Sequence, residues 1–372
     1  MKPLFGLKDQ ANLPFHLSIV LLAAAIDLVT TENLPAQATA YNVLEISADG
    51  GQVSCRINNL GDLVGRSGNS GPGGNRATIW GHGTWKPKQL GALPGGEYSS
   101  ASAINDAGEV AGVSNTPNTV VPFIWNATGG LQRISLLPGD NGGQAFGINR
   151  YGHLVGYSSG PNGARAFLWT RSAGAHNLGS LPGGNHSKAR DVNDSDEVVG
   201  TSASPAGDRA VLWTKTGQAR DLGTLPGDIS SEAIAINNAG DVVGYSKGPA
   251  GLRAFLWTQA TGMQDLGVLP GGNSSRAFDI NDLGYVVGSS TDSSGDHAFI
   301  WTKQAGMTDL NSAASAALGV VFVEAHAINS RGQILVMGKP TPGSSGGIAL
   351  PEHQDCAPAP PSTFLLIPNP AQ

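Results

Sequence analysis

Three charged side chains in a repeated sequence pattern are the strongest candidates for chemistry in this chain. Arg56, Asp191 and Asp279 each stand two residues before an Asn, at a position where the other copies of the pattern carry Ala or Gly. If this segment is a strand that lines a central axis, the three side chains project into a channel whose other walls are small. Charged groups in a concave site are candidates for ligand binding or acid–base chemistry. The alternative is that they form structural ion pairs or face solvent at the end of a strand.

The other motifs that could carry catalysis or bind a metal predict neither. The serine-hydrolase pattern Gly-x-Ser-x-Gly occurs at Gly156–Gly160, Gly244–Gly248 and Gly343–Gly347, but no helical pattern follows, as a nucleophile elbow would require. The eight His lack the i,i+2 or i,i+4 spacing of metal ligands. Asn193–Glu197 is rich in oxygen atoms, but it lacks the Gly and the distal Glu of a calcium loop. We therefore assign no catalytic residue, no metal site and no cofactor.

The candidate residues belong to a repeat that organises most of the chain. The shared Asn recurs seven times, with spacings of 44 residues in the middle of the chain and of 47 and 48 at its ends. A strand that ends in Trp recurs six times with nearly the same period. Repeats of roughly 40 to 50 residues are typical of propellers and solenoids. The Asn positions are Asn58, Asn105, Asn149, Asn193, Asn237, Asn281 and Asn329, and the Trp positions are Trp80, Trp125, Trp169, Trp213, Trp257 and Trp301.

One repeat resolves into short strands joined by tight turns. Within residues 263–302 the predicted strands are Met263–Leu269, Arg276–Ile280, Tyr285–Ser289 and His297–Thr302. Pro270-Gly271 predicts a type II turn, and Asn281–Gly284 predicts a type I turn that ends in a left-handed Gly. We therefore expect an all-β fold, a seven-bladed β-propeller built from seven four-stranded repeats of about 44 residues.

Seven repeats predict a closed ring, because closure hides the sheet edges that an open stack would expose. We expect Tyr41–Ile46 as the outer strand of the last blade, Thr363–Ile367 as the delayed fourth strand of the seventh repeat, and the Ala-rich strand before each Asn as the innermost one. Cys55 in the first repeat and Cys356 in the last would then be neighbours, and a disulfide could latch the ring. The sequence leaves open whether they are bonded or are two free thiols.

The composition excludes several classes of protein. The 53 Gly and 23 Pro rule out a long helical bundle, while 40% hydrophobic residues and seven Trp argue against a disordered linker. The net charge of −6 argues against nucleic acid and against an anionic membrane surface as partners.

Three linked motifs resemble those of the HAF-repeat family. The family's name-giving triplet stands here as His297-Ala-Phe299, and it is joined by the Asn-turn segment Ala-x-x-Ile-Asn and by Leu-Gly-x-Leu-Pro-Gly-Gly. The resemblance covers about residues 41–368. It implies a secreted or surface-associated bacterial repeat protein with propeller-like units, and it implies no established reaction and no catalytic residues.

The predicted domains are a signal peptide or leader in residues 1–40, the propeller in 41–368, with a Pro/Gly-rich insertion at 341–361 before its last strand, and a C-terminal tail in 369–372. The leader prediction depends on the apolar run Leu17–Ile26, which is too short to span a bilayer, and on small residues just before Tyr41. The cleavage position stays open. We expect a secreted protein, extracellular or periplasmic, that is monomeric and has no membrane span once the leader is removed.

The leading functional hypothesis is a binding or scaffolding module for a protein or glycan partner. The segments Ser158–Gly163 and Ser289–Gly295 vary among the repeats, as expected of recognition loops. One alternative is a hydrolase or lyase on a polysaccharide that uses Asp191 and Asp279, which would need the two carboxylates within about 5–10 Å of each other. Another alternative is a purely structural component of the extracellular matrix.

Overall fold

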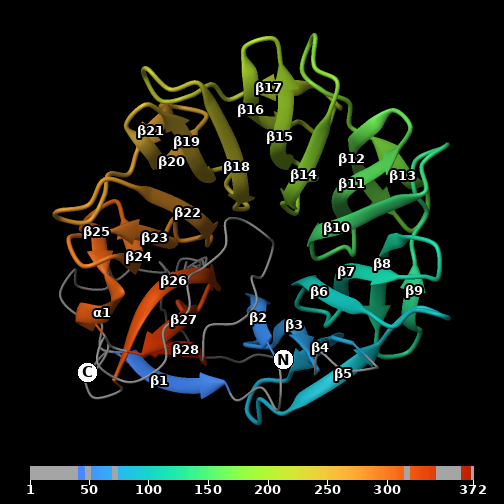
Figure 1. Cartoon of the computed structure of the whole chain (residues 1–372), viewed down its shortest axis with the longest axis horizontal. Coiled ribbons are helices and arrows are strands. Elements are labelled where there is room, and N and C mark those ends of the chain that lie inside the picture. The colour runs from blue at the N-terminus through green and yellow to red at the C-terminus, as the bar shows by residue number, and fades with distance from the viewer. Residues whose placement is uncertain (1–40, 47–51, 69–73, 314–318, 341–361, 370–372) are drawn as a thin grey trace, which may run out of the picture. The chain divides into compact units, whose positions relative to one another are not determined.

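The described part of the chain is almost entirely β-structure. The computed structural model describes residues 41–46, 52–68, 74–313, 319–340 and 362–369. The chain divides into two units, Met1–Leu34 and Pro35–Gln372, and all described residues belong to the second. These residues form seven four-stranded antiparallel sheets and one short helix, α1 (Leu310–Ala313). The sheets are the seven blades of a β-propeller (Figure 1), which confirms the predicted fold.

Six blades are continuous in sequence, and their strands follow one another from the axis outward. Blade 1 consists of β2 (Gln52–Ile57), β3 (Leu63–Ser67), β4 (Arg76–Trp80) and β5 (Pro87–Gly91), blade 2 of β6 (Ser99–Ile104), β7 (Val110–Asn115), β8 (Val120–Asn126) and β9 (Gly130–Arg133), and blade 3 of β10 (Gly142–Ile148), β11 (Leu154–Gly160), β12 (Gly163–Thr170) and β13 (Gly174–Asn177). Blade 4 consists of β14 (Ser187–Val192), β15 (Val198–Ser204), β16 (Gly207–Trp213) and β17 (Ala219–Asp221), blade 5 of β18 (Ser230–Ile236), β19 (Val242–Gly248), β20 (Gly251–Thr258) and β21 (Gly262–Asp265), and blade 6 of β22 (Ser275–Ile280), β23 (Val286–Thr291), β24 (Asp296–Thr302) and β25 (Gly306–Asp309).

Blade 7 closes the ring with strands from both ends of the described chain. Its order from the axis outward is β26 (Val320–Ile328), β27 (Ile334–Pro340), β28 (Ser362–Pro368) and β1 (Tyr41–Ile46). The strand β1 pairs antiparallel with β28, so that Tyr41 lies opposite Pro368. This arrangement confirms that Tyr41–Ile46 is the outer strand of the last blade. The segment 341–361 lies outside the described residues.

The Ala-rich strand that precedes each Asn is the innermost strand of its blade, as predicted (Figure 1). Each of these strands contains a β-bulge near its end, for example between Ala277 and Asp279 in β22. A bulge leaves one extra residue unpaired and re-aims the side chains beside it. The bulge therefore decides how the position two before each Asn faces the axis.

The two predicted turns form as expected. The N–H of Gly284 donates to the carbonyl of Asn281 at 3.0 Å, and Gly284 has a positive φ of 76°. In blade 4 the same turn position is Asp196, which adopts φ 61°. Gly272 N–H donates to the carbonyl of Leu269 at 3.0 Å, and Gly271 between them has φ 83°. Positive φ explains why Gly, or less often Asp, occupies these places.

Two boundaries differ from the sequence expectation. The outer strand β21 ends at Asp265, whereas a strand was expected as far as Leu269. The Asp265 carboxylate accepts the N–H of Gly267 at 2.8 Å, and this local turn directs the chain to the next blade. The expected recognition loop at Ser158–Gly163 is mostly strand, because β11 extends to Gly160 and β12 begins at Gly163.

The hydrophobic core is divided among the gaps between blades. One cluster packs Leu212 of blade 4 against Phe255 and Trp257 of blade 5. Another packs Trp80 of blade 1 against Leu365 of blade 7, so the ring is closed by apolar contacts as well as by strand pairing. The recurring Trp therefore lies in the core between blades, as expected from the apolar area it buries.

Candidate functional site

The seven recurring asparagines form a closed ring of hydrogen bonds around the axis. The side-chain amide of each Asn donates one N–H to the backbone carbonyl of the Asn in the next blade, at 3.0–3.3 Å. The last of these bonds runs from Asn329 in blade 7 to Asn58 in blade 1. All seven side chains are buried. We refer to these seven residues as the asparagine ring.

Six of the seven ring asparagines use both side-chain N–H groups and the side-chain oxygen, and Asn281 uses one N–H and the oxygen. In Asn237 the amide donates to Asn281 and to the Asp241 carboxylate, both at 3.3 Å. Its Oδ1 accepts the backbone N–H groups of Ala239 and Asp241 at 3.1 and 2.9 Å. The sequence indicated only a turn role for Asn. It missed the bond between blades, because a period in the sequence does not show which carbonyl a side chain reaches.

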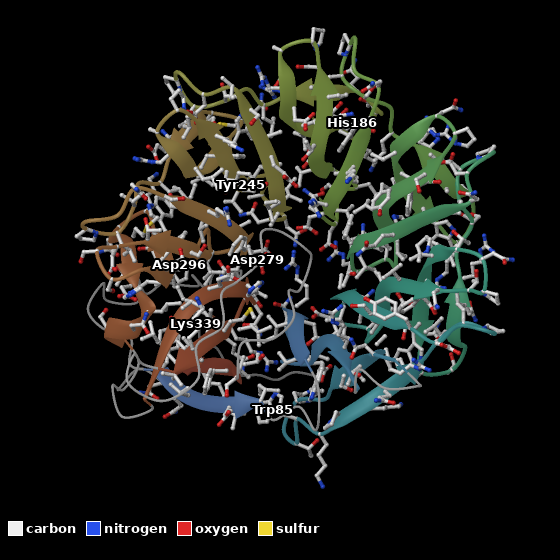
Figure 2. The ribbon with its side chains drawn as sticks, viewed as in Figure 1. Trp85, His186, Tyr245, Asp279, Asp296 and Lys339 are labelled. Carbon is white, nitrogen blue, oxygen red and sulfur yellow. The ribbon has the colours of Figure 1, made fainter. Side chains whose placement is uncertain are left out.

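A polar cavity lies at the axis where the innermost strands end. Its volume is about 220 Å³, and its lining includes the asparagine ring, the residues on either side of each ring Asn, and all three predicted site residues, Arg56, Asp191 and Asp279. Figure 2 shows Asp279 toward the centre of the ring, with Asp296 of the same blade farther out. The structure thus brings the three predicted residues together, although their role as ligand contacts stays a prediction.

The two cavity aspartates tie neighbouring blades together. Asp191 accepts the N–H of Val192 at 2.9 Å and, across the gap to blade 5, the N–H of Ile236 at 3.1 Å. Asp279 repeats this arrangement and accepts the N–H of Ile280 at 3.0 Å and that of Ile328 in blade 7 at 2.9 Å. Both oxygens of each carboxylate are thus occupied by backbone donors. This geometry is that of a structural tie, and it does not favour the polysaccharide hydrolase or lyase alternative.

Burial and charge set the protonation of these carboxylates. Burial raises the pKa of Asp279 to about 6, against the lowering effects of the Arg56 charge and of its backbone donors, and the nearby charge of Asp191 raises it further. Burial also raises the pKa of Asp191, again opposed by Arg56. Arg56 donates to the carbonyl of His326 in blade 7 at 3.3 Å. One arginine therefore compensates two acids at the axis.

A second set of polar side chains follows the asparagine ring at the mouth of the cavity. These rim residues stand directly after each ring Asn and are Asn59, Asp106, Arg150, Asp194, Asn238, Asp282 and Ser330. Five of them donate their backbone N–H to a rim side chain of the next blade, as when the N–H of Asn238 donates to Asp282 at 2.9 Å. The rim therefore presents mainly hydrogen-bond acceptors.

The serines of the Gly-x-Ser-x-Gly patterns within the described residues are structural. Ser158 and Ser246 are fully buried. Ser246 accepts the N–H of Leu225 at 3.1 Å, and Ser158 accepts that of Leu137 at 3.2 Å and donates to Asp140 at 2.6 Å. Equivalent serines in other blades likewise accept the N–H of a Leu in the segment that leads into the blade. The pattern therefore marks a repeated bridge between blades.

One group of possible metal ligands was not found from the sequence. Asp292, His297 and Asp309 in blade 6 place one ligand atom each within 4.8 Å of the others. His297 Nδ1 lies 2.7 Å from Asp309 Oδ2. In blade 5 the equivalent pair is an Arg253–Asp265 ion pair at 2.9 Å. Because its members come from a loop and from two strands, spacing alone gives no signal for this group.

The remaining cysteine and calcium expectations have different outcomes. Cys356 and the side chain of Cys55 lie outside the described residues, so the disulfide stays a prediction. In Asn193–Glu197, where calcium was considered, Asn193 belongs to the asparagine ring and donates to Glu197 at 2.9 Å. Asp196 in the same segment accepts from Asn149 at 3.0 Å, so these groups already serve the turn and the ring.

Comparisons with known proteins support the fold alone. No protein-family model and no curated protein matches the chain. Among solved structures, it is similar to an oligogalacturonate lyase in complex with manganese, with a TM-score of 0.54 and 12% identity over 88% of this chain and 96% of that one. It is also similar to a streptogramin B lyase, with a TM-score of 0.53 and 12% identity over 89% and 98% of the two chains. A virginiamycin B lyase from Staphylococcus aureus has a TM-score of 0.52 and 11% identity over 88% and 99%.

Among the described residues, no helix has the length and apolar character needed to cross a bilayer.

Proposed function

We propose that the chain is a secreted binding module that holds the polar end of a protein or glycan partner in its axial cavity. The single observation that carries this proposal is the preformed polar cavity of about 220 Å³, with Arg56, Asp191 and Asp279 in its walls. Ligand pockets for whole small molecules usually have about 300–1,000 Å³. A smaller cavity suits the end of a larger ligand whose remainder lies across the rim.

Rigidity of the walls supports binding. The asparagine ring and the carboxylate ties hold every blade to the next one at the cavity. A site whose polar groups are fixed before the ligand arrives loses less conformational entropy on binding. Acid–base catalysis would instead need a carboxylate that can approach the substrate, whereas the bonds to Ile236 and Ile328 hold Asp191 and Asp279 against the gaps between blades.

A glycan array probed with the full chain tests the proposal. We expect binding to a limited set of glycans and at least a tenfold loss in the variant Arg56→Gln, because Arg56 lines the cavity. The matched control is Arg253→Gln, which removes an ion pair in blade 5 to Asp265, outside the cavity, and should keep the binding. Equal loss in both variants would contradict an axial site. Absence of binding on the array, together with absence of turnover in an activity screen of the same glycans, would favour a purely structural role.

Export is part of the same proposal and is tested separately. We expect the full chain to leave the cytoplasm of a bacterial host, and a chain lacking residues 1–40 to be retained, because the leader pattern precedes the first strand at Tyr41. Fractionation followed by immunodetection measures both. Cytoplasmic retention of the full chain would contradict export and would leave the axial site untouched.

A further inference from the structure

The walls of the axial cavity carry a second set of donors, the backbone N–H groups that stand directly before the asparagine ring. In blade 5 the N–H of Asn237 donates to the carbonyl of Asp241 at 3.1 Å, and the adjacent pair is Ile236 with Val242. Hydrogen-bonded and non-hydrogen-bonded pairs alternate in an antiparallel ladder. The N–H of Ile236 therefore points away from β19, toward the axis, where Asp191 accepts it.

Blades 1, 2 and 3 show the same alternation of pairs at the end of the innermost strand. Asn58, Asn105 and Asn149 each donate their backbone N–H across the hairpin, at 3.0–3.1 Å. The pairs beside them, which include Ile57, Ile104 and Ile148, are then non-hydrogen-bonded pairs. These three N–H groups also point toward the axis.

The cavity is therefore divided into two halves. In blades 4 to 7, Asp191 and Asp279 accept the N–H groups of Val192, Ile236, Ile280 and Ile328. In blades 1 to 3, no side chain among the described residues accepts from Ile57, Ile104 or Ile148. The residue in blade 2 that corresponds to Asp191 is Ala103, which lines the cavity and has no acceptor on its side chain.

We propose that the N–H groups of Ile104 and Ile148 bind the carboxylate of a ligand, and that this ligand is a terminal acidic sugar. This inference rests on the axial binding site proposed above. The protein itself supplies the template, because Asp191 and Asp279 each place one carboxylate between two equivalent N–H groups of neighbouring blades. A ligand carboxylate beside Ala103 would make the same two bonds.

The rim favours a sugar over a peptide terminus. Asp106, Asp194 and Asp282 at the mouth are acceptors, and a carboxylate retains lone pairs after it has accepted one or two N–H groups. A uronic acid carries several hydroxyl donors next to its carboxylate, whereas a peptide terminus offers a single N–H and a side chain. The five Asp of the cavity lining outnumber its two Arg, so a ligand with a single negative charge at its end fits better than a polyanion.

Calorimetric titration of the full chain with glucuronate, with glucose as the neutral analogue, tests the inference. We expect glucuronate to bind at least tenfold more tightly than glucose. In NMR spectra of 15N-labelled protein, the backbone amide signals of Ile104 and Ile148 should shift on binding. Binding of a peptide carboxylate without binding of glucuronate would overturn the sugar.

Two variants test the position of the carboxylate. Ala103→Asp supplies an internal carboxylate to the two N–H groups and should lower glucuronate affinity at least tenfold. Ala235→Asp adds the same charge at the equivalent place in blade 5, where Asp191 and Asp279 already accept the neighbouring N–H groups of Ile236 and Ile280. It should change the affinity less than threefold, so equal losses in the two variants would show mere charge repulsion and overturn the inference.

A third variant distinguishes occupation of the two N–H groups by an internal acceptor from charge repulsion and from misfolding. Ala103→Asn places a neutral amide oxygen near the same N–H groups and should also weaken glucuronate binding, with an unchanged thermal unfolding midpoint. If glucuronate fails to bind while the glycan array still gives ligands that depend on Arg56, the carboxylate inference is wrong and the proposed function stands. If neither experiment shows binding, both are wrong.

Discussion

Each ring asparagine directly follows an innermost strand, and the position two residues before it lies in that strand, yet the two positions differ in kind. The ring position is Asn in every blade, and each Asn makes the same bond to the next blade. The earlier position carries one Arg, two Asp, one Gly and three Ala. A position that performs the same bond in each blade tolerates one residue type. The earlier position, which lines the cavity in blades 1, 2, 4 and 6, is free to differ, and it therefore makes one half of the cavity unlike the other.

The largest expected effect comes from breaking the ring. Asn237→Ala removes two donated and two accepted hydrogen bonds and leaves the groups that faced the side chain unsatisfied. At about 1–3 kcal/mol for an unsatisfied buried group, we expect the free energy of unfolding to fall by roughly 3–5 kcal/mol. Chemical denaturation followed by tryptophan fluorescence measures it.

The rim residue that follows provides the matched control for this prediction. Asn238 is exposed, and Asn238→Ala should cost less than about 1 kcal/mol, as most surface substitutions do. If the two variants lose the same stability, the asparagine ring has no special structural role.

A second repeated position should behave like the ring on a smaller scale. Ser246→Ala leaves the buried N–H of Leu225 without its acceptor, so the free energy of unfolding should fall by about 1–3 kcal/mol. The control is Ser204→Ala, whose hydroxyl bonds to Gly207 at an exposed hairpin and should matter little. If the Ser246→Ala protein is as stable as the parent, the repeated serines do not stabilise the fold as the ring asparagines do.

The sequence predicted the fold and three charged residues that the structure places in one cavity, and the reasons are physical. Seven copies of one strand pattern define the blades, and departures such as Arg56 and Asp279 stand out only against a regular background. The bonds that connect blades were not predictable, since Asn237 reaches a carbonyl in the next blade across a gap of 44 residues. Nor were the N–H directions, which depend on the pairing register and on the bulge in each innermost strand.

The smallest expected effect concerns the pH dependence of stability. It tests the variable position, which lies two residues before each ring Asn. The pKa of Asp279 is raised to about 6 by burial, so the folded state holds its proton more tightly than the unfolded state, in which an Asp titrates near 3.9. Stability from this group therefore rises as the pH falls through 6. Between pH 7 and pH 5 the linkage amounts to about 1 kcal/mol. Asp279→Asn should remove this contribution, which urea denaturation at the two pH values measures.

The charges that face Asp279 provide the internal check on that slope. Arg56 lowers the pKa of Asp279 and Asp191 raises it. Arg56→Gln should therefore move the change in stability to higher pH, and Asp191→Asn should move it to lower pH. Opposite shifts from two residues at equivalent places in blades 1 and 4 would show that the variable position acts as one electrostatic unit across the cavity. Shifts in the same direction, or no shifts, would mean that the three charges do not interact across the cavity. The variable position would then lack the coupling between blades that the asparagine ring has.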